Sequence, residues 1–341
     1  MSVPMEAVSM LSAPPRQVVQ AGAPVAGRYA GWIDHINWQG LAGEYRRSAV
    51  WRKVHHKRWQ YVAIATEQCF IGLAIVDVGW TNTAFAYLFD RQSKQLIGQF
   101  SQDGIPGLTA KVSNRPGAGT LSWFKHTRGA MRFEHRGGAR YQLSLWTKSG
   151  FQIDAEISLH DSAAPLLAIG PITQGGCAHA TQKTSALKVN GVAQAGGQRF
   201  VLDAGVASLD YSNGLLARET QWRWASAHAP DIGFNLQQGY FGNHENVLWL
   251  DGQLIPLGRA EFEFDPRYPM MPWQVRTDDG LLDLVFEPEG ARQESKNLMI
   301  AASYYIQPIG TFSGIVKAHP DAPGRQVNQL VGVTEDHLSR W

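Results

Sequence analysis

The sequence is poor in cysteine and nearly neutral in net charge. Its two cysteines, Cys69 and Cys177, lie far apart, and neither belongs to a CxxC motif or to a cluster with histidine. A secreted protein of 341 residues would often carry several disulfides, so we expect a reducing, cytoplasmic location. The formal net charge is +2, and the one basic cluster, at residues 52–58, is short and runs into an apolar strand. A solvated strand entrance is favoured there over the alternative of an anion site. We therefore expect no nucleic-acid partner.

Long hydrophobic runs are also absent. The most apolar stretch, Cys69–Trp80, is too short to cross a bilayer and contains Asp77. The first residues, MSVPMEAVSMLSAPPRQ, lack the basic start and continuous apolar core of a signal peptide. These features predict a soluble protein with no integral membrane segment.

The common cofactor and hydrolase motifs are missing. The chain has no GxGxxG after a strand, no GxxxxGK[ST] loop and no GxSxG elbow. His244-Glu245 begins like a zinc-binding HExxH motif, but Leu248 stands where the second histidine is needed. We accordingly predict neither a cofactor nor a bound metal.

What the chain does have is apolar–polar alternation with period two. In the segment 151–159, apolar residues alternate with polar ones, and the segment 282–286 repeats the pattern. Such alternation is typical of strands with one buried face. Four turn-forming pairs predict hairpins between antiparallel neighbours: Asn190-Gly191, Asn213-Gly214, Asp251-Gly252 and Asp279-Gly280. Helical periodicity is nearly absent, so the fold class is all-β.

The length favours two domains, because one ordinary core rarely serves more than about 250 residues. Residues 1–27, rich in Pro, Ala, Val and Gly, are predicted to form a mobile lead-in. We place the domain seam in the glycine-rich segment Pro171–Ala180, which interrupts the alternation. The predicted domains are residues 28–175 and 176–341.

Long segments of the chain resemble the DUF2804 family of uncharacterised proteins. The resemblance spans roughly residues 40–316 and includes KRWQYVAIATEQCFIGLAIVDVGW, TQKTSALKVNGVAQAGGQRFVLDAGVASLDYSNGLLARETQWRWA, GFNLQQGYFGNHENVLWLDG and PWQVRTDDGLLDLVFEP. That family is similar, more distantly, to the carotenoid 1,2-hydratase and AttH-like proteins. The resemblance implies two lipocalin-like halves, each an antiparallel β-barrel or sandwich, around an apolar pocket.

The distant similarity also points to particular residues. It runs through Asp210 in SLDYSNG and then through Trp222-Arg223-Trp224. In the hydratases the corresponding Asp resembles the acid that protonates an isoprenoid double bond. This chain departs from their pattern, because Leu209 replaces an aromatic residue and Tyr211 follows where histidine is common.

Asp210 has two possible roles. Burial in an aromatic cavity would raise the pKa of its carboxyl and make it a general acid. Alternatively, Asp210 caps the backbone of a turn formed by 210–214. Trp222 and Trp224 lie two apart and therefore share one face of a strand, either as cation-stabilising walls or simply as core.

Other candidates surround these residues in the sequence. Glu245 is either a partner carboxylate for Asp210 or part of a polar loop, and His228 is either a proton shuttle or a surface residue. The predicted ligand-binding residues, each with a plain structural alternative, are Trp59, Tyr61, Lys183, Trp222, Trp224 and Asn246.

We expect a cofactor-independent hydratase, dehydratase, isomerase or cyclase that acts by proton transfer on a small hydrophobic, isoprenoid or lipid-like molecule. The alternatives are a carrier of an apolar ligand and a packed interaction module. The oligomeric state, the substrate and the direction of the reaction stay open.

Overall fold

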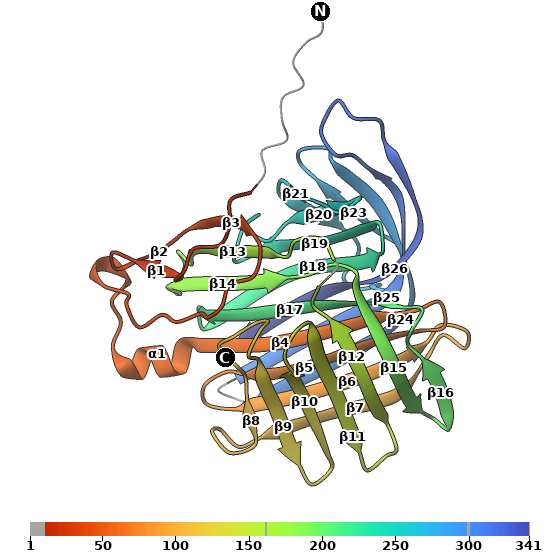
Figure 1. The fold of residues 1–341 in the computed structure, drawn as a ribbon, viewed down its shortest axis with the longest axis horizontal. Helices are drawn as coiled ribbons and strands as arrows, with labels where there is room; N and C mark the ends of the chain where they lie inside the picture. The colour runs from red at the N-terminus through yellow and green to blue at the C-terminus, as the bar shows by residue number, and fades with distance from the viewer. Residues whose placement is uncertain (1–10, 161, 299–300, 341) are drawn as a thin grey trace, which may run out of the picture.

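The computed structural model describes residues 11–160, 162–298 and 301–340. Within these ranges the protein is almost entirely β-structure, arranged as a nearly closed barrel sheet and a half-barrel sheet (Figure 1). One α-helix, α1 (Ala49–His55), and a 3-10 turn, η1 (Gly43–Tyr45), are the helical elements of the described chain. The predicted fold class, all-β with two lipocalin-like halves, is confirmed. None of the described helices combines the length and apolar character that crossing a membrane requires.

The strands form where the sequence alternates. In the segment 151–159, Ile153 and Ile157 are buried whereas Gln152 and Asp154 are exposed. Each such isoleucine contributes about 1.5–3 kcal/mol when it leaves water, which fixes the face that the strand turns inward.

The first sheet holds fifteen strands of the described chain, with neighbours antiparallel along the order β7-β6-β5-β4-β17-β15-β12-β11-β10-β9-β8. Strands β13, β14, β3 and β16 attach beside this path. The bounds are β3 (Gly27–Ala30), β4 (His56–Ala65), β5 (Cys69–Asp77), β6 (Asn82–Asp90), β7 (Gln95–Gly104), β8 (Ala110–Lys111), β9 (Leu121–His126), β10 (Gly129–His135), β11 (Arg140–Thr147), β12 (Gln152–Ser158), β13 (Leu166–Pro171), β14 (Ala178–Lys183), β15 (Leu187–Ala195), β16 (Gln198–Val201) and β17 (Val206–Leu215).

The second sheet holds nine strands of the described residues in the order β21-β20-β19-β18-β26-β25-β24-β23-β22. Its bounds are β18 (Glu219–Ala229), β19 (Ile232–Gly239), β20 (Val247–Leu250), β21 (Gln253–Pro256), β22 (Ala260–Glu263), β23 (Trp273–Thr277), β24 (Leu282–Leu298), β25 (Ala301–Val316) and β26 (Arg325–Arg340). A small ribbon of β1 (Val19–Gln20) and β2 (Ala23–Pro24) precedes both sheets.

Strand pairing changes from the first sheet to the second between Leu215 and Glu219. Strand β14, which begins within the expected seam at Pro171–Ala180, and strands β15 to β17 after it still pair within the first sheet. The division into residues 28–175 and 176–341 concerned domains and stays a prediction. Residues 1–10 of the expected lead-in lie outside the described residues, whereas Val18 and Val19 are buried against the core of the first sheet.

Two of the four expected hairpin turns are confirmed. Asp251-Gly252 joins β20 to β21 with positive φ at both residues, and Asp279-Gly280 lies between β23 and β24. The other two predictions are wrong, because Asn190-Gly191 lies inside β15 and Asn213-Gly214 inside β17.

The two misassigned glycines mark close packing within the sheet. A Cβ on Gly191 would lie 2.3 Å from the carbonyl oxygen of Asp154, and one on Gly214 would lie 2.9 Å from the His179 ring. Glycine is needed there because neighbouring groups approach the backbone, not because the chain reverses.

Each sheet has its own apolar core, and a third cluster joins them. That cluster combines Tyr61, Phe70 and Tyr87 of the first sheet with Trp224 and Ile309 of the second. Most of the functional candidates gather at this junction.

Candidate functional site

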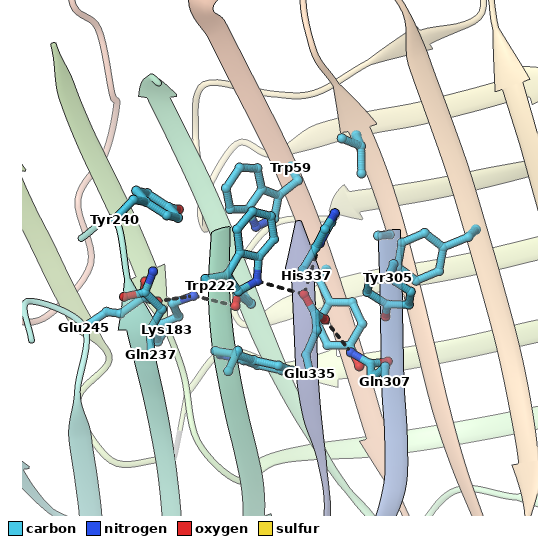
Figure 2. A pocket seen from close by; sticks show the side chains of 16 residues that line it. Trp59, Lys183, Trp222, Gln237, Tyr240, Glu245, Tyr305, Gln307, Glu335 and His337 are labelled. Atoms are coloured by element: carbon cyan, nitrogen blue, oxygen red, sulfur yellow. Dashed lines mark hydrogen bonds and ion pairs between the residues drawn. The ribbon is translucent and has the colours of Figure 1, made fainter. Parts of the chain in front are cut away.

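A cavity of about 110 Å³ lies between the two sheets. Figure 2 shows its walls, which come from strands of both sheets and from the connection after β19. The lining residues are Trp59, Tyr61, Ala74, Val76, Phe85, Lys183, Asp210, Trp222, Trp224, Gln237, Tyr240, Glu245, Tyr305, Gln307, Glu335 and His337.

A buried ion triad forms one wall. The Nζ of Lys183 lies 2.5 Å from Oδ2 of Asp210 and 2.7 Å from Oε2 of Glu245. Strand register sets the first pair, since Lys183 on β14 stands opposite Asp210 on β17. Glu245 reaches the same amine from the connection between β19 and β20. The two carboxyls share a single amine, so the triad carries a net negative charge when both are ionised.

Asp210 has a raised pKa and an oxygen without a partner within the described chain. Burial raises its pKa from 3.8 to about 6, Lys183 opposes the rise, and the neighbouring Glu245 adds to it. Oδ2 is held by Lys183, whereas Oδ1 is buried and has no hydrogen-bond partner among the described residues. A protonated Asp210 can therefore present its proton to a molecule in the cavity.

The alternative role for Asp210 as a turn cap is wrong. Asp210 lies in the middle of β17 and pairs with Tyr61 on one side and Lys183 on the other. No chain reversal occurs at 210–214, because the whole segment continues the strand.

Glu245 is anchored on its other side by a hydrogen-bonded chain. Asn235 Nδ2 donates to the Glu245 carbonyl at 2.9 Å, and Trp224 Nε1 donates to Asn235 Oδ1 at 2.8 Å. This chain links the tryptophan wall to the ion triad and keeps the Glu245 side chain, 4% exposed, in place.

A third carboxyl, Glu335 on β26, lines the cavity away from the triad. Its Oε1 accepts from Trp222 Nε1 at 2.8 Å, and its Oε2 accepts from Gln307 Nε2 at 3.0 Å (Figure 2). His337 Nδ1 lies 3.3 Å from Oε1. Sequence reasoning missed Glu335 and His337, although their spacing of two in the last strand is the signal that would have placed both on one face.

Gln237 on β19 was also missed. It is only 2% exposed, yet neither its Oε1 nor its Nε2 has a hydrogen-bond partner within the described chain. Nothing in the sequence NLQQG distinguishes Gln237 from its neighbour Gln238. The Oε1 of Gln238 accepts a hydrogen bond from Arg223 at 3.2 Å.

Aromatic rings form the remaining walls. Trp59 and Trp222 are stacked with centroids 6.2 Å apart and an interplanar angle of 7°, and Tyr61 meets Trp224 edge-on at 5.9 Å. Trp222 and Trp224 thus share one face, as their spacing predicted. Rings of this kind provide apolar contact and a negative face toward a positive charge.

Two predicted site residues lie elsewhere. His228 is buried at the end of β18, bound to Ser185 Oγ and Ser226 Oγ at 2.8 Å each, and does not line the cavity. Burial lowers its pKa to about 3, so it is neutral near pH 7. The alternative of a surface position is wrong, and the role of proton shuttle stays a prediction.

Asn246 is also not among the residues that line the cavity. Its Oδ1 accepts from the backbone N–H of Gln237 at 2.7 Å, and its Nδ2 donates to the Gly258 carbonyl at 2.9 Å. Asn246 therefore fixes the backbone that carries Gln237.

A second, larger chamber of about 290 Å³ adjoins the first. The two share Val76, Phe85, Tyr305 and His337 as lining residues. Arg292 stacks on this shared wall, with its guanidinium carbon 4.0 Å from the centroid of the Phe85 ring. In the parts of the chain that the structure covers, no group of three or more His, Cys, Asp or Glu side chains is placed to hold a metal ion.

Solved structures with a similar fold include three proteins. Kievitone hydratase from Nectria haematococca has a TM-score of 0.54 and 11% identity, with 85% of this chain and 90% of that chain covered. A putative AttH from Nitrosomonas europaea has a TM-score of 0.51 and 15% identity, with coverage of 83% and 92%. CghA has a TM-score of 0.56 and 8% identity, with coverage of 97% and 96%. At these identities the likeness is one of fold.

No curated protein matches the chain. The predicted family resemblance, in contrast, is confirmed, together with the distant likeness to AttH-like hydratases. Residues 16–341 match the family described as "Domain of unknown function (DUF2804)". That match covers nearly the whole sequence, and the chain therefore belongs to the DUF2804 family.

Proposed function

We propose that this protein is an acid–base enzyme that adds, removes or shifts a proton on a small hydrophobic substrate held between the two sheets. The observation that carries the proposal is Asp210, a carboxyl with a pKa raised to about 6 and an unpartnered Oδ1 in an aromatic cavity. Hydration, dehydration, isomerisation and cyclisation all begin with such a proton transfer. The step as written requires no cofactor.

In the proposed step, the proton on Oδ1 of Asp210 passes to a substrate double bond or to a leaving hydroxyl. Lys183 stays protonated and stabilises the carboxylate that remains, since its amine already holds Oδ2. The positive charge that develops on the substrate faces the Trp59 and Trp222 rings.

The second proton transfer needs a base. Glu335 serves as this base, because its carboxylate lines the same cavity without sharing Lys183. It takes a proton from water in a hydration, or from the carbon next to the cation in a dehydration or isomerisation. Its bonds to Trp222 and Gln307 hold it in position.

The adjoining chamber offers room for the rest of a larger substrate. Val76 and Phe85 line both chambers and supply apolar contact along the shared wall. The fold shared with a hydratase is compatible with this chemistry and supports the reaction class.

Mass spectrometry of small molecules that co-purify with the protein provides the test. The extracted compound is incubated in deuterated water with wild type, with Asp210→Asn and with Asp154→Asn, an exposed aspartate on β12. We expect a product of altered mass with wild type and the control, and a rate about 10²–10⁴-fold lower with Asp210→Asn.

The competing function is a carrier for an apolar ligand, which needs only the aromatic walls and a polar anchor. The same intact compound recovered from all three proteins, with no product and no deuterium, would favour the carrier and contradict the enzyme. A packed module without a ligand is disfavoured by the cavity itself.

A further inference from the structure

Gln237 occupies an energetically unfavourable position. Its side chain is buried at the cavity wall, and both ends of its carboxamide lack a hydrogen-bond partner within the described residues. Burying an amide without partners is unfavourable, because the hydrogen bonds that it makes with water in the unfolded chain are not replaced. Asn246 binds the backbone N–H of Gln237 and leaves its carboxamide without a partner. The arrangement therefore points to a molecule in the cavity as the partner of the carboxamide.

The charges around Gln237 limit the charge that a molecule bound in the cavity can carry. Asp210, Glu245 and Glu335 line the same cavity, and the only amine on its lining, among the described residues, is that of Lys183. An anionic group would meet like charges in a buried setting, which is strongly unfavourable. A neutral group carries no such penalty.

The chemistry of a carboxamide narrows the choice further. It offers both a donor and an acceptor, and it keeps them at every ordinary pH. A plain hydrocarbon would leave both unsatisfied, whereas a hydroxyl can donate to Oε1 or accept from Nε2. The tryptophan rings nearby suit an apolar remainder.

We propose that the cavity binds a neutral, apolar alcohol whose hydroxyl is hydrogen-bonded by Gln237. This deepens the proposed function and, as a statement about the substrate, rests on it. The hydroxyl is then the group that leaves in a dehydration: Asp210 protonates the oxygen, the C–O bond breaks to release water, and Glu335 takes a proton from the adjacent carbon. Hydration is the reverse, so the same alcohol is its product.

Calorimetric binding of a matched probe pair tests the proposal. Indanol and indane have the same ring skeleton and differ by one hydroxyl. We expect wild type to bind indanol about tenfold more tightly than indane, as one net hydrogen bond provides. In Gln237→Leu the affinities for indanol and indane should become about equal, because indanol binds more weakly and indane binds as before or more tightly.

Gln238→Leu is the matched control, because Gln238 follows on the same strand and faces Arg223 instead of the cavity. It should keep the wild-type preference. Equal affinities in wild type, a preference that survives Gln237→Leu, or no binding of either probe would overturn the proposal.

The binding measurement is independent of turnover. A tenfold preference that depends on Gln237, combined with full activity in Asp210→Asn, would contradict the proposed acid while leaving the substrate class supported. Loss of activity in Asp210→Asn without any preference for indanol would do the opposite.

Discussion

At the scale of single residues, the chemistry of the site depends on one amine, that of Lys183, which two carboxyls share. The amine of Lys183 pairs with Oδ2 of Asp210 and with Oε2 of Glu245, and all three side chains are largely buried. One amine cannot fully stabilise two buried carboxylates, and burial raises the pKa of Asp210, which also has an unpartnered oxygen. Removal of Lys183 would leave both carboxyls without an ion-pair partner. Lys183 is therefore a structural part of the site and not a solvated surface residue.

The raised pKa of Asp210 makes folding stability depend on pH. The carboxyl holds its proton up to about pH 6 in the folded state but only to about pH 3.8 in the unfolded chain. Its stabilising contribution is therefore fully present below pH 3.8 and is lost as pH rises through about 6.

We expect the free energy of unfolding of wild type, relative to Asp210→Asn, to fall by roughly 1–3 kcal/mol between pH 4 and pH 7. Urea unfolding at several pH values measures the difference, with Asp154→Asn as the control for loss of a carboxyl. A difference that instead grows with pH would show that Asp210 is stabilised as the carboxylate.

At the scale of elements, strand register assembles the site. Strand β17 pairs with β4 along one edge and with β14 along the other, so Asp210 is flanked by Tyr61 and Lys183. A shift of one residue in β17 would turn Asp210 to the opposite face of the sheet. The turns that limit register are therefore as important to the site as its side chains.

The hairpin turn between β20 and β21 allows the contribution of turn backbone conformation to stability to be measured. Gly252 has φ of +80° with open space around its Cα, so a substitution there meets backbone strain and no clash. We expect Gly252→Ala to lower the free energy of unfolding by about 1 kcal/mol, and Gly252→Asn by less, since Asn tolerates this conformation.

Thermal and urea unfolding of both variants measure the effect. Equal losses for Ala and Asn would mean that the cost does not arise from the left-handed backbone.

At the scale of the whole molecule, the site exists because two sheets meet. The cluster that joins them combines Phe70 and Tyr87 with Trp224 and Ile309. Tyr87 also donates a hydrogen bond to Gln307, which in turn holds Glu335. The proposed acid, Asp210, thus belongs to the first sheet and the proposed base, Glu335, to the second, so separation of the sheets would separate the two.

Ile309→Ala tests the coupling between the sheets. Ile309 is fully buried in the joining cluster, and its truncation should cost about 2–5 kcal/mol. Because the cluster belongs to both sheets, tryptophan fluorescence and far-ultraviolet circular dichroism should still report one coincident transition.

Ile315→Ala is the control on the same strand, since Ile315 is 45% exposed. It should change the free energy of unfolding by less than about 0.5 kcal/mol. Two separate transitions in Ile309→Ala would show that the sheets unfold independently.

The sequence alone was sufficient for the strands and for part of the site. Alternation is a local property, because side chains on a strand point to opposite faces in turn, and the buried pattern at Ile153 and Ile157 follows directly from it. The family resemblance drew attention to Asp210, Trp222 and Trp224. The fold brings Glu245 and Lys183 to the same cavity.

Only the tertiary structure decided which distant residues meet. Asn190-Gly191 and Asn213-Gly214 look like turns locally, but pairing with neighbouring strands keeps both extended. His228 and Gln237 lie on adjacent strands, yet the first packs against serines outside the cavity and the second lines it. The physical reason is that strand order and register set such proximity through contacts between segments far apart in the chain, and these leave no local pattern in the sequence.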